Sequence, residues 1–282
     1  MKKLTDKDII NRLTGIFEDN NWDIDDSSKI TMFNRFTEYL KILNFEQQEV
    51  FLELTNSFVF YNFDTYEKIL HNCLITFLDR EKEFISGTGK KIVYVLPLDN
   101  MKKSTVNSSF LVAYLLKSNS IRYNNQINKI TWNVVIYLEK KLIDKINLSP
   151  NKRVLLVDDF IGTGETALNA YSNYRKTKLE NHKLSVLSLA GTKYAEKKLR
   201  EKEVNFYFGI IAPTIHDIWN NEEKSKKIEI ISQISKIRET KQDENLGYGK
   251  ISSLISMIRT PNNTLPLFWE DTKKNNAPFP RL

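Results

Sequence analysis

The chain has 282 residues, 41% of them hydrophobic, which is enough to bury the core of one large domain or two small ones. One cysteine and three histidines exclude a disulfide framework and a zinc site made of Cys and His. The 42 Lys and Arg exceed the 35 Asp and Glu and leave a net charge of +7. Such a charge favours polyanionic partners, although a lysine-rich solvated surface would give the same balance.

The amino-terminal residues carry charges where a signal peptide has its apolar core. No uninterrupted apolar run approaches the roughly 20 residues that cross a bilayer. We therefore expect a cytoplasmic protein without a membrane span, and the scarcity of cysteine agrees with this.

Residues 1–85 have apolar side chains at helical spacing, and they predict about four amphipathic helices. Thr5 and Asp8 form a capping pair before the first helix. Aromatic side chains are frequent here, and at this spacing we interpret them as packing rather than as a binding surface. Examples are Phe33, Phe51, Phe60, Tyr61 and Phe63.

The organisation changes near residue 86. The segment ISGTGKK, residues 85–91, resembles a P-loop, but its glycine spacing is wrong and the strand comes after it instead of before it. We interpret it as a linker. The expected domains are a helical region over residues 1–85 and an α/β domain over residues 86–282 that ends in a helical extension.

From residue 91 onward, short apolar runs alternate with helical stretches, a pattern typical of a parallel sheet covered by helices on both faces. The predicted strands are residues 92–96, 154–157, 184–190 and 206–211, and the predicted helices are residues 106–117, 165–176 and 193–201. Residues 130–146 are ambiguous, with a strand running into a helix as one interpretation. The fold class is thus α/β with a parallel, Rossmann-like sheet.

One stretch carries recognisable chemistry: VLLVDDFIGTGETAL, residues 154–168. Ligands of open α/β sheets bind beyond the carboxyl ends of the strands, and Asp158 and Asp159 follow a predicted strand directly. The next residues form a turn into a helix, so the backbone N–H groups of Thr163, Gly164 and the two following residues should converge with the positive end of the helix dipole behind them.

This turn predicts a phosphate site. Gly162 and Gly164 permit left-handed backbone angles and close approach of an anion, and the hydroxyls of Thr163 and Thr166 can donate to phosphate oxygens. Carboxylates beside a phosphate must bind something else on the ligand, either hydroxyls or a metal ion. A ribose 5-phosphate meets both requirements. A plain acidic cap on a helix does not explain the order of the glycines and threonines.

Residues 154–166 resemble, without a gap, the signature of type I phosphoribosyltransferases: an apolar strand, two acidic residues, two further positions, then a small residue, Thr or Ser, Gly, any residue, and Thr or Ser. The resemblance implies that Asp158 and Asp159 hold the ribose hydroxyls of phosphoribosyl pyrophosphate. It also implies that the 5-phosphate is bound by Thr163, Gly164, Glu165 and Thr166.

Members of that family bind pyrophosphate in a loop after an early strand of the sheet. Lys102 and Lys103 occupy such a loop here, where lysines could equally be solvated. A second, mobile loop closes over the reacting centre in the family. Residues 122–132 and residues 144–152 are both candidates for it.

The whole chain is also similar to phosphoribosyltransferase-like proteins of bacterial antiphage systems, including some retrons. The helical amino-terminal region, the divergent central domain and residues 247–269 carry this resemblance. It implies an effector that is an oligomer or a subunit of a complex with a reverse transcriptase and its noncoding RNA. Asn262, Asn263 and Thr264 would lie where related enzymes recognise the acceptor, unless this segment is a simple Asn-Pro turn.

The implied reaction displaces pyrophosphate from the anomeric carbon of the ribose, with Mg²⁺ held by Asp158 and Asp159 and with Lys102 or Lys103 assisting the leaving group. Two other functions stay open. The protein could be a ribose-phosphate sensor without catalysis, or a structural subunit whose basic surface binds nucleic acid.

Overall fold

The computed structural model describes residues 3–98, 107–136, 138–240, 245–273 and 275–281. The chain divides into two compact units. Unit 1 combines Met1–Asn62 with Ala212–Leu282, and unit 2 is Phe63–Ile211.

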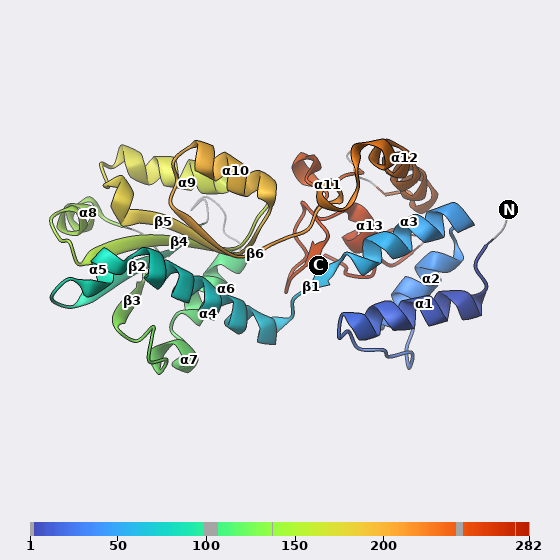
Figure 1. The fold of residues 1–282 in the computed structure, drawn as a ribbon, viewed down its shortest axis with the longest axis horizontal. Coiled ribbons are helices and arrows are strands. Elements are labelled where there is room, and N and C mark those ends of the chain that lie inside the picture. Colours follow the sequence, from blue (N-terminus) through green and yellow to red (C-terminus); the bar gives the residue numbers. More distant parts are fainter. Residues whose placement is uncertain (1–2, 99–106, 137, 241–244, 274, 282) are drawn as a thin grey trace. The chain divides into compact units, whose positions relative to one another are not determined.

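Unit 2 is built on a parallel sheet, which has five strands among the described residues (Figure 1). In spatial order the strands are β3 (Ile130–Val134), β2 (Lys91–Pro97), β4 (Lys152–Ile161), β5 (Leu184–Gly191) and β6 (Phe206–Ile211). Because all neighbours are parallel, the carboxyl ends of the strands share one edge of the sheet, which we call the carboxyl edge.

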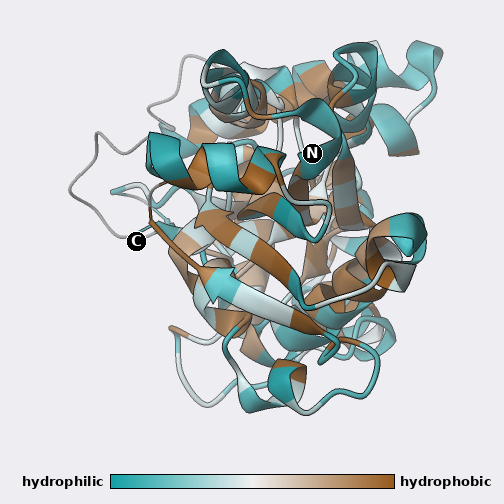
Figure 2. Cartoon of the chain, turned by 90° about the vertical axis from the view of Figure 1, so that its left-hand side faces the viewer, coloured by the Kyte–Doolittle hydropathy of each residue, from teal (hydrophilic) through white to brown (hydrophobic). Residues whose placement is uncertain are grey.

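Helices cover both faces of this sheet (Figure 1). One face packs against α4 (Phe63–Arg80) and α6 (Ser108–Leu115), and the other against α8 (Lys140–Asn147), α9 (Glu165–Lys176) and α10 (Lys193–Glu201). The shorter helices are α5 (Lys82–Ser86), α7 (Asn119–Arg122) and the 3₁₀ turn η1 (Asn181–Lys183). Figure 2 shows the apolar residues concentrated along the strands, as burial on both faces requires.

The sequence predicted most of this layout. The bounds of β6, α9 and α10 coincide with the predicted ones, and residues 130–146 hold a strand followed by a helix. An α/β fold with a parallel sheet, preceded by helices, is therefore confirmed. β4 is longer than predicted because it continues through the two aspartates.

The segment ISGTGKK connects α5 to β2 at the amino ends of the strands. The Lys91 ammonium is buried there and donates to Asn151 Oδ1 at 2.5 Å, while Asn151 Nδ2 donates to the carbonyl of Thr88 at 2.7 Å. The segment is thus fixed to the loop before β4 and belongs to unit 2.

Unit 1 is formed by the amino-terminal and carboxyl-terminal parts of the sequence. Its elements are α1 (Asp6–Asp19), α2 (Met32–Lys41), α3 (Phe45–Asn56), β1 (Val59–Phe60), α11 (Ile215–Ile218), α12 (Asn221–Arg238), η2 (Tyr248–Lys250), β7 (Ile255–Ser256) and α13 (Pro266–Trp269). β1 and β7 pair in parallel. Thr5 and Asp8 form the predicted capping box of α1.

The core of unit 1 is rich in aromatic rings. Phe51 stacks on Tyr39 with ring centroids 4.3 Å apart, and Phe58 stacks on Phe279 at 4.8 Å. The interpretation of the aromatics as packing is confirmed for Phe33 and Phe51, which are buried. Phe63 differs because it starts α4 and is 55% exposed.

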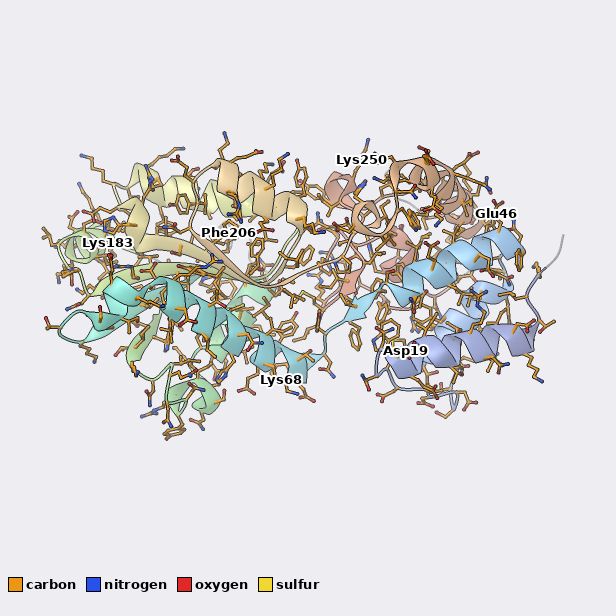
Figure 3. The ribbon with its side chains drawn as sticks, in the orientation of Figure 1. Asp19, Glu46, Lys68, Lys183, Phe206 and Lys250 are labelled. Atoms are coloured by element: carbon orange, nitrogen blue, oxygen red, sulfur yellow. The ribbon has the colours of Figure 1, made fainter. Side chains whose placement is uncertain are left out.

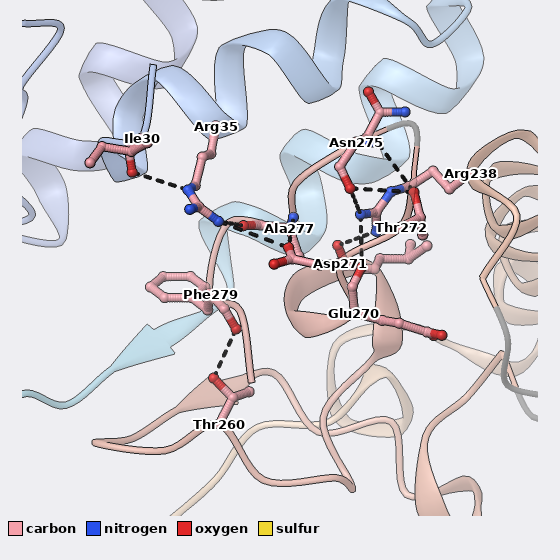
Figure 4. A network of polar contacts seen from close by, with 11 residues as sticks. Ile30, Arg35, Arg238, Thr260, Glu270, Asp271, Thr272, Asn275, Ala277 and Phe279 are labelled. Atoms are coloured by element: carbon pink, nitrogen blue, oxygen red, sulfur yellow. Dashed lines mark hydrogen bonds and ion pairs between the residues drawn. The ribbon is translucent and has the colours of Figure 1, made fainter. Parts of the chain in front are cut away.

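Two arginines fix the carboxyl-terminal segment to the rest of unit 1 (Figure 4). Arg238 is buried and donates to the carbonyls of Glu270 at 2.9 Å and Asn275 at 3.3 Å. Arg35 donates to the carbonyl of Ala277 at 2.9 Å. These charged donors satisfy carbonyls that no regular ladder pairs.

The division into units differs from the boundary expected at residue 86. α4 has the helical pattern of the helices before it, but it packs on β5 and β6 of unit 2. The carboxyl-terminal extension packs with the amino-terminal helices instead, since α12 lies against α3. Helical periodicity shows which face of a helix is buried and does not show against which element.

None of the helices in the described part of the chain is both long enough and apolar enough to span a membrane.

Candidate functional site

β4 carries the two aspartates to the carboxyl edge of the sheet. Asp158 pairs in register with Ser188 of β5, three residues before β4 ends. Since side chains alternate along a strand, Asp158 shares the face of Val154 and Leu156, which pack toward α8, α9 and α10. Asp159 is on the face covered by α4 and α6.

Asp159 is held by two hydroxyl groups of the protein. Its Oδ1 accepts a hydrogen bond from Ser108 Oγ at 2.6 Å, and its Oδ2 accepts one from the Tyr66 hydroxyl at 3.2 Å. The residue is only 5% exposed, and this burial raises the pKa of the Asp159 carboxyl although the hydrogen bonds oppose the shift. Asp159 forms no ion pair within the described part of the chain.

Asp158 is less buried than its neighbour. Its Oδ1 accepts a hydrogen bond from the backbone N–H of Asp159 at 2.9 Å, which orients the carboxylate. The two acidic residues therefore differ: Asp158 is partly open at the edge of the sheet, and Asp159 is enclosed beneath it.

The turn after β4 contains one left-handed glycine. Gly164 is the N-cap of α9 and has a φ of +76°, a left-handed angle that favours glycine. Gly162 is not in the left-handed region, so only one of the two glycines has the predicted backbone role. The carbonyl of Gly162 accepts a bond from Thr192 Oγ1 at 2.7 Å, which fixes the turn to the loop after β5.

No side chain caps the amino terminus of α9. Among the described residues, the backbone N–H groups of Gly164 and Thr166 have no acceptor, so they remain available to an anion beside the helix dipole. The N–H of Glu165 makes a long bond to Thr163 Oγ1 at 3.3 Å. The Glu165 carboxylate pairs with Lys198 at 3.4 Å, in agreement with a backbone role for Glu165.

Lys102 and Lys103 lie outside the described residues, and their role stays a prediction. The two candidate closing loops are at the wrong edge of the sheet. Residues 122–132 lead into β3 and residues 144–152 lead into β4, so both are at the amino ends of parallel strands, opposite Asp158. The described residues that follow β3, Val135 and Ile136, are at the carboxyl edge instead.

The segment proposed for acceptor recognition uses its polar groups internally. Asn263 Nδ2 donates to the carbonyl of Tyr248 at 2.9 Å, and the hydroxyl of Thr264 donates to the carbonyl of Ile255 at 2.7 Å. Both side chains are buried. The structure thus supports the alternative interpretation of residues 261–264 as a turn.

The donor set fits a hard divalent cation only if a ligand completes the coordination. Asp158 and Asp159 offer carboxylate oxygens, which Mg²⁺ prefers. Within the described residues, no group of three or more His, Cys, Asp or Glu could hold a metal ion by itself. Mg²⁺ commonly binds through one or two carboxylates together with water and substrate phosphates, and the two aspartates are a donor set of that size.

Comparison with known proteins identifies the family. The model of the PRTase-CE family matches residues 37–281, and the chain belongs to this family, which is of phosphoribosyltransferase type. Similar solved structures include the APRTase from Giardia lamblia complexed with 9-deazaadenine, which is 13% identical with a TM-score of 0.31 over 51% of this chain and 80% of that one. Another is the purine phosphoribosyltransferase from Pyrococcus horikoshii Ot3, 13% identical with a TM-score of 0.29 over 53% of this chain and 86% of that one. A search among curated proteins gave no match.

The structure adds site residues that sequence reasoning missed. Tyr66 and Ser108 contact Asp159 but are 93 and 51 residues away from it in the chain. The only signal for Tyr66 was its inward position in the helical pattern, and Ser108 had no signal apart from following the predicted pyrophosphate loop.

Proposed function

We propose that this protein binds phosphoribosyl pyrophosphate, or a related ribose 5-phosphate, together with Mg²⁺ at the carboxyl edge of β4. One observation carries the proposal: a carboxylate pair is followed at once by a left-handed glycine turn whose amide groups are uncapped at the start of α9. Such a turn suits a phosphate, and carboxylates beside it suit the ribose hydroxyls.

The proposed roles follow from the exposure of each group. The backbone N–H groups of residues 163–166 bind the 5-phosphate, and the hydroxyls of Thr163 and Thr166 add donors. Asp158, the more open carboxylate, accepts from a ribose hydroxyl. Asp159 is the second carboxylate of the pair and lies behind it.

The reaction we propose is displacement of pyrophosphate from the anomeric carbon by an acceptor nucleophile. The bond from that carbon to the pyrophosphate oxygen breaks as the bond to the acceptor forms, and the acceptor proton passes to solvent or to the departing pyrophosphate. Asp158 and the turn hold the ribose and its phosphate in place, and Lys102 or Lys103 neutralises the leaving pyrophosphate. Asp158 and Asp159, together with the ligand, would hold Mg²⁺, which would neutralise more of that charge.

A second candidate is a binding module that recognises the ribose phosphate without catalysis. The observation in its favour is that both oxygens of Asp159 are already used by Tyr66 and Ser108. A sensor needs the phosphate turn but needs no stabilisation of a leaving group. Release of pyrophosphate in the presence of candidate acceptors separates the two functions.

At the cellular level, we propose a cytoplasmic effector of a bacterial antiphage system such as a retron, assembled with a reverse transcriptase and its noncoding RNA. The resemblance of the whole chain supports this role. Phage challenge of cells that carry the complete system tests it, because replacing Asp158 and Asp159 by asparagine should abolish protection. Intact protection by the double variant would contradict an effector that acts through this site.

The primary experiment is calorimetric titration of phosphoribosyl pyrophosphate with Mg²⁺ into the wild type and into the Asp158→Asn, Asp159→Asn double variant. We expect binding by the wild type and an affinity lower by roughly 100-fold in the double variant, since charged hydrogen bonds to the ribose are lost. Asp144→Asn removes an exposed carboxylate of α8 and serves as the control. Equal binding by all three proteins would place the ligand elsewhere.

A further inference from the structure

Two helices of unit 2 bring one hydroxyl each to the same buried carboxylate. Tyr66 is the fourth residue of α4, is fully buried, and donates to Asp159 Oδ2 at 3.2 Å. Ser108 is the first residue of α6 and donates to Asp159 Oδ1 at 2.6 Å. Each oxygen of the carboxylate therefore has its own donor from a different element.

The position of Tyr66 is determined by the packing of α4 on the sheet. Tyr66, Ile69 and Cys73 are among the buried residues of α4. Lys68 of the same helix, labelled in Figure 3, is exposed. Gly209 on β6 permits this close packing, because a Cβ there would lie 2.5 Å from a methyl carbon of Ile69. The backbone of α4 thus holds the tyrosine against the sheet.

A continuous set of hydrogen bonds leads from these hydroxyls to the open carboxylate. The Asp159 side chain is fixed by Tyr66 and Ser108, and the Asp159 backbone N–H donates to Asp158 Oδ1 at 2.9 Å. The hydrogen bonds that hold Asp159 in place therefore also hold its backbone N–H, which orients Asp158. We infer that Tyr66 and Ser108 are positioning residues of the ribose site, which act on the ligand through Asp159 and Asp158 without touching it.

This inference rests on the proposed function, since it assigns roles around the proposed ribose ligand. Its physical basis is the cost of an unsatisfied buried carboxylate. Asp159 has no ion pair among the described residues, and removal of either hydroxyl leaves one of its oxygens without that donor. The carboxylate is then held less firmly, and so is the N–H bonded to Asp158.

The test uses single-hydroxyl deletions with matched controls. Tyr66→Phe and Ser108→Ala should each weaken binding of phosphoribosyl pyrophosphate with Mg²⁺ by roughly five- to tenfold in calorimetry, about the effect of one lost hydrogen bond. Tyr171→Phe removes a bond of the same 3.2 Å length from another buried tyrosine of unit 2. Ser109→Ala removes a buried hydroxyl next to Ser108 that has no partner among the described residues. Both controls should bind like the wild type.

Two further measurements separate positioning from a general loss of structure. In an Asp159→Leu background, which has no acceptor at this position, Tyr66→Phe should cause at most about a twofold additional loss, because the partner through which it acts is gone. Inorganic phosphate, which needs only the turn after β4, should bind to Tyr66→Phe and to the wild type within about twofold.

The outcomes are distinct. Wild-type binding with no loss in Tyr66→Phe or Ser108→Ala would overturn the inference and leave the proposed function intact. A full additional loss in the Asp159→Leu background would also overturn it, since the hydroxyls would then act by another route. Absence of binding by the wild type would overturn the proposed function and this inference with it.

Discussion

In unit 2, the buried charged groups at the amino ends of the strands, which we call the amino edge, have different partners from those at the carboxyl edge. At the amino edge, Arg153 and Glu81 form a largely buried ion pair at 3.0 Å, and Glu81 also accepts from the Tyr207 hydroxyl. The Arg153 guanidinium lies 4.4 Å from the ring centre of Phe84. At the carboxyl edge, Asp159 is more deeply buried than Arg153 and Glu81, and among the described residues it has hydroxyl partners but no cation.

The comparison shows which edge of the sheet adds to the stability of unit 2 and which edge lowers it. A compensated ion pair with an aromatic neighbour holds the amino edge together. A buried carboxylate that has no cation among the described residues, next to a left-handed turn, lowers the stability of the free protein and is a pattern typical of functional sites. Each prediction below tests one side of this contrast.

The largest expected effect is at the amino edge. Arg153→Ala leaves the mostly buried carboxylate of Glu81 without its cation and should lower the free energy of unfolding by about 2–3 kcal/mol. Urea denaturation followed by circular dichroism measures this. Phosphoribosyl pyrophosphate affinity should change little below the unfolding transition, because the pair is remote from Asp158.

An exposed pair provides the comparison. Arg200 and Glu196 are 2.9 Å apart on the surface of α10, with Arg200 72% exposed. Arg200→Ala should alter the free energy of unfolding by no more than about 0.5 kcal/mol. If Arg153→Ala is equally mild, the amino edge is not the stabilising side of the sheet.

A smaller effect on stability is expected at the turn after β4. In Gly164→Ala the new Cβ fits, since the nearest atoms, all of Ala195, are at least 3.7 Å away. Its cost comes from the φ of +76° and should be about 1–2 kcal/mol in thermal unfolding. The variant should also bind phosphate more weakly than the wild type, because relaxation of the turn moves the amide groups. Unchanged binding would mean that the left-handed turn has no part in the site.

The smallest expected effect is an increase in stability, caused by a change at Asp159. Burial makes the pKa of Asp159 higher in the folded protein than its ordinary value of 3.8, so folding favours the protonated form. The contribution of Asp159 to stability is therefore most favourable below pH 3.8 and is lost as the pH rises through the folded pKa. Asp159→Asn avoids that loss.

We expect Asp159→Asn to melt a few degrees above the wild type at pH 7 without Mg²⁺, with the difference shrinking toward pH 4. Differential scanning fluorimetry across this pH range measures it. A variant that is less stable than the wild type at pH 7 would show that the two hydroxyl bonds outweigh the burial of the charge.

The sequence was most informative where a local pattern is tied to local chemistry. The apolar run before Asp158 and the Gly-Thr turn after it determine β4, the turn and α9 without reference to the rest of the chain. Long-range partnerships were not accessible in this way. Nothing near Tyr66 indicates that its hydroxyl meets Asp159, and the apolar stripe of α12 could cover any apolar surface. The candidate closing loops failed for a related reason, because their composition does not encode the edge of the sheet at which they lie.

Because unit 1 is made of two separate segments of the chain, a truncation at either terminus affects its core. Unit 2 is an insertion, tethered to its host at Phe63 and at Ile211. The first tether enters α4 three residues before Tyr66, and the second leaves β6 at its carboxyl end. Both covalent crossings therefore leave unit 2 at the carboxyl edge of the sheet, the edge that carries Asp158. Deleting either terminus, in contrast, would remove half of the host and leave its aromatic core open.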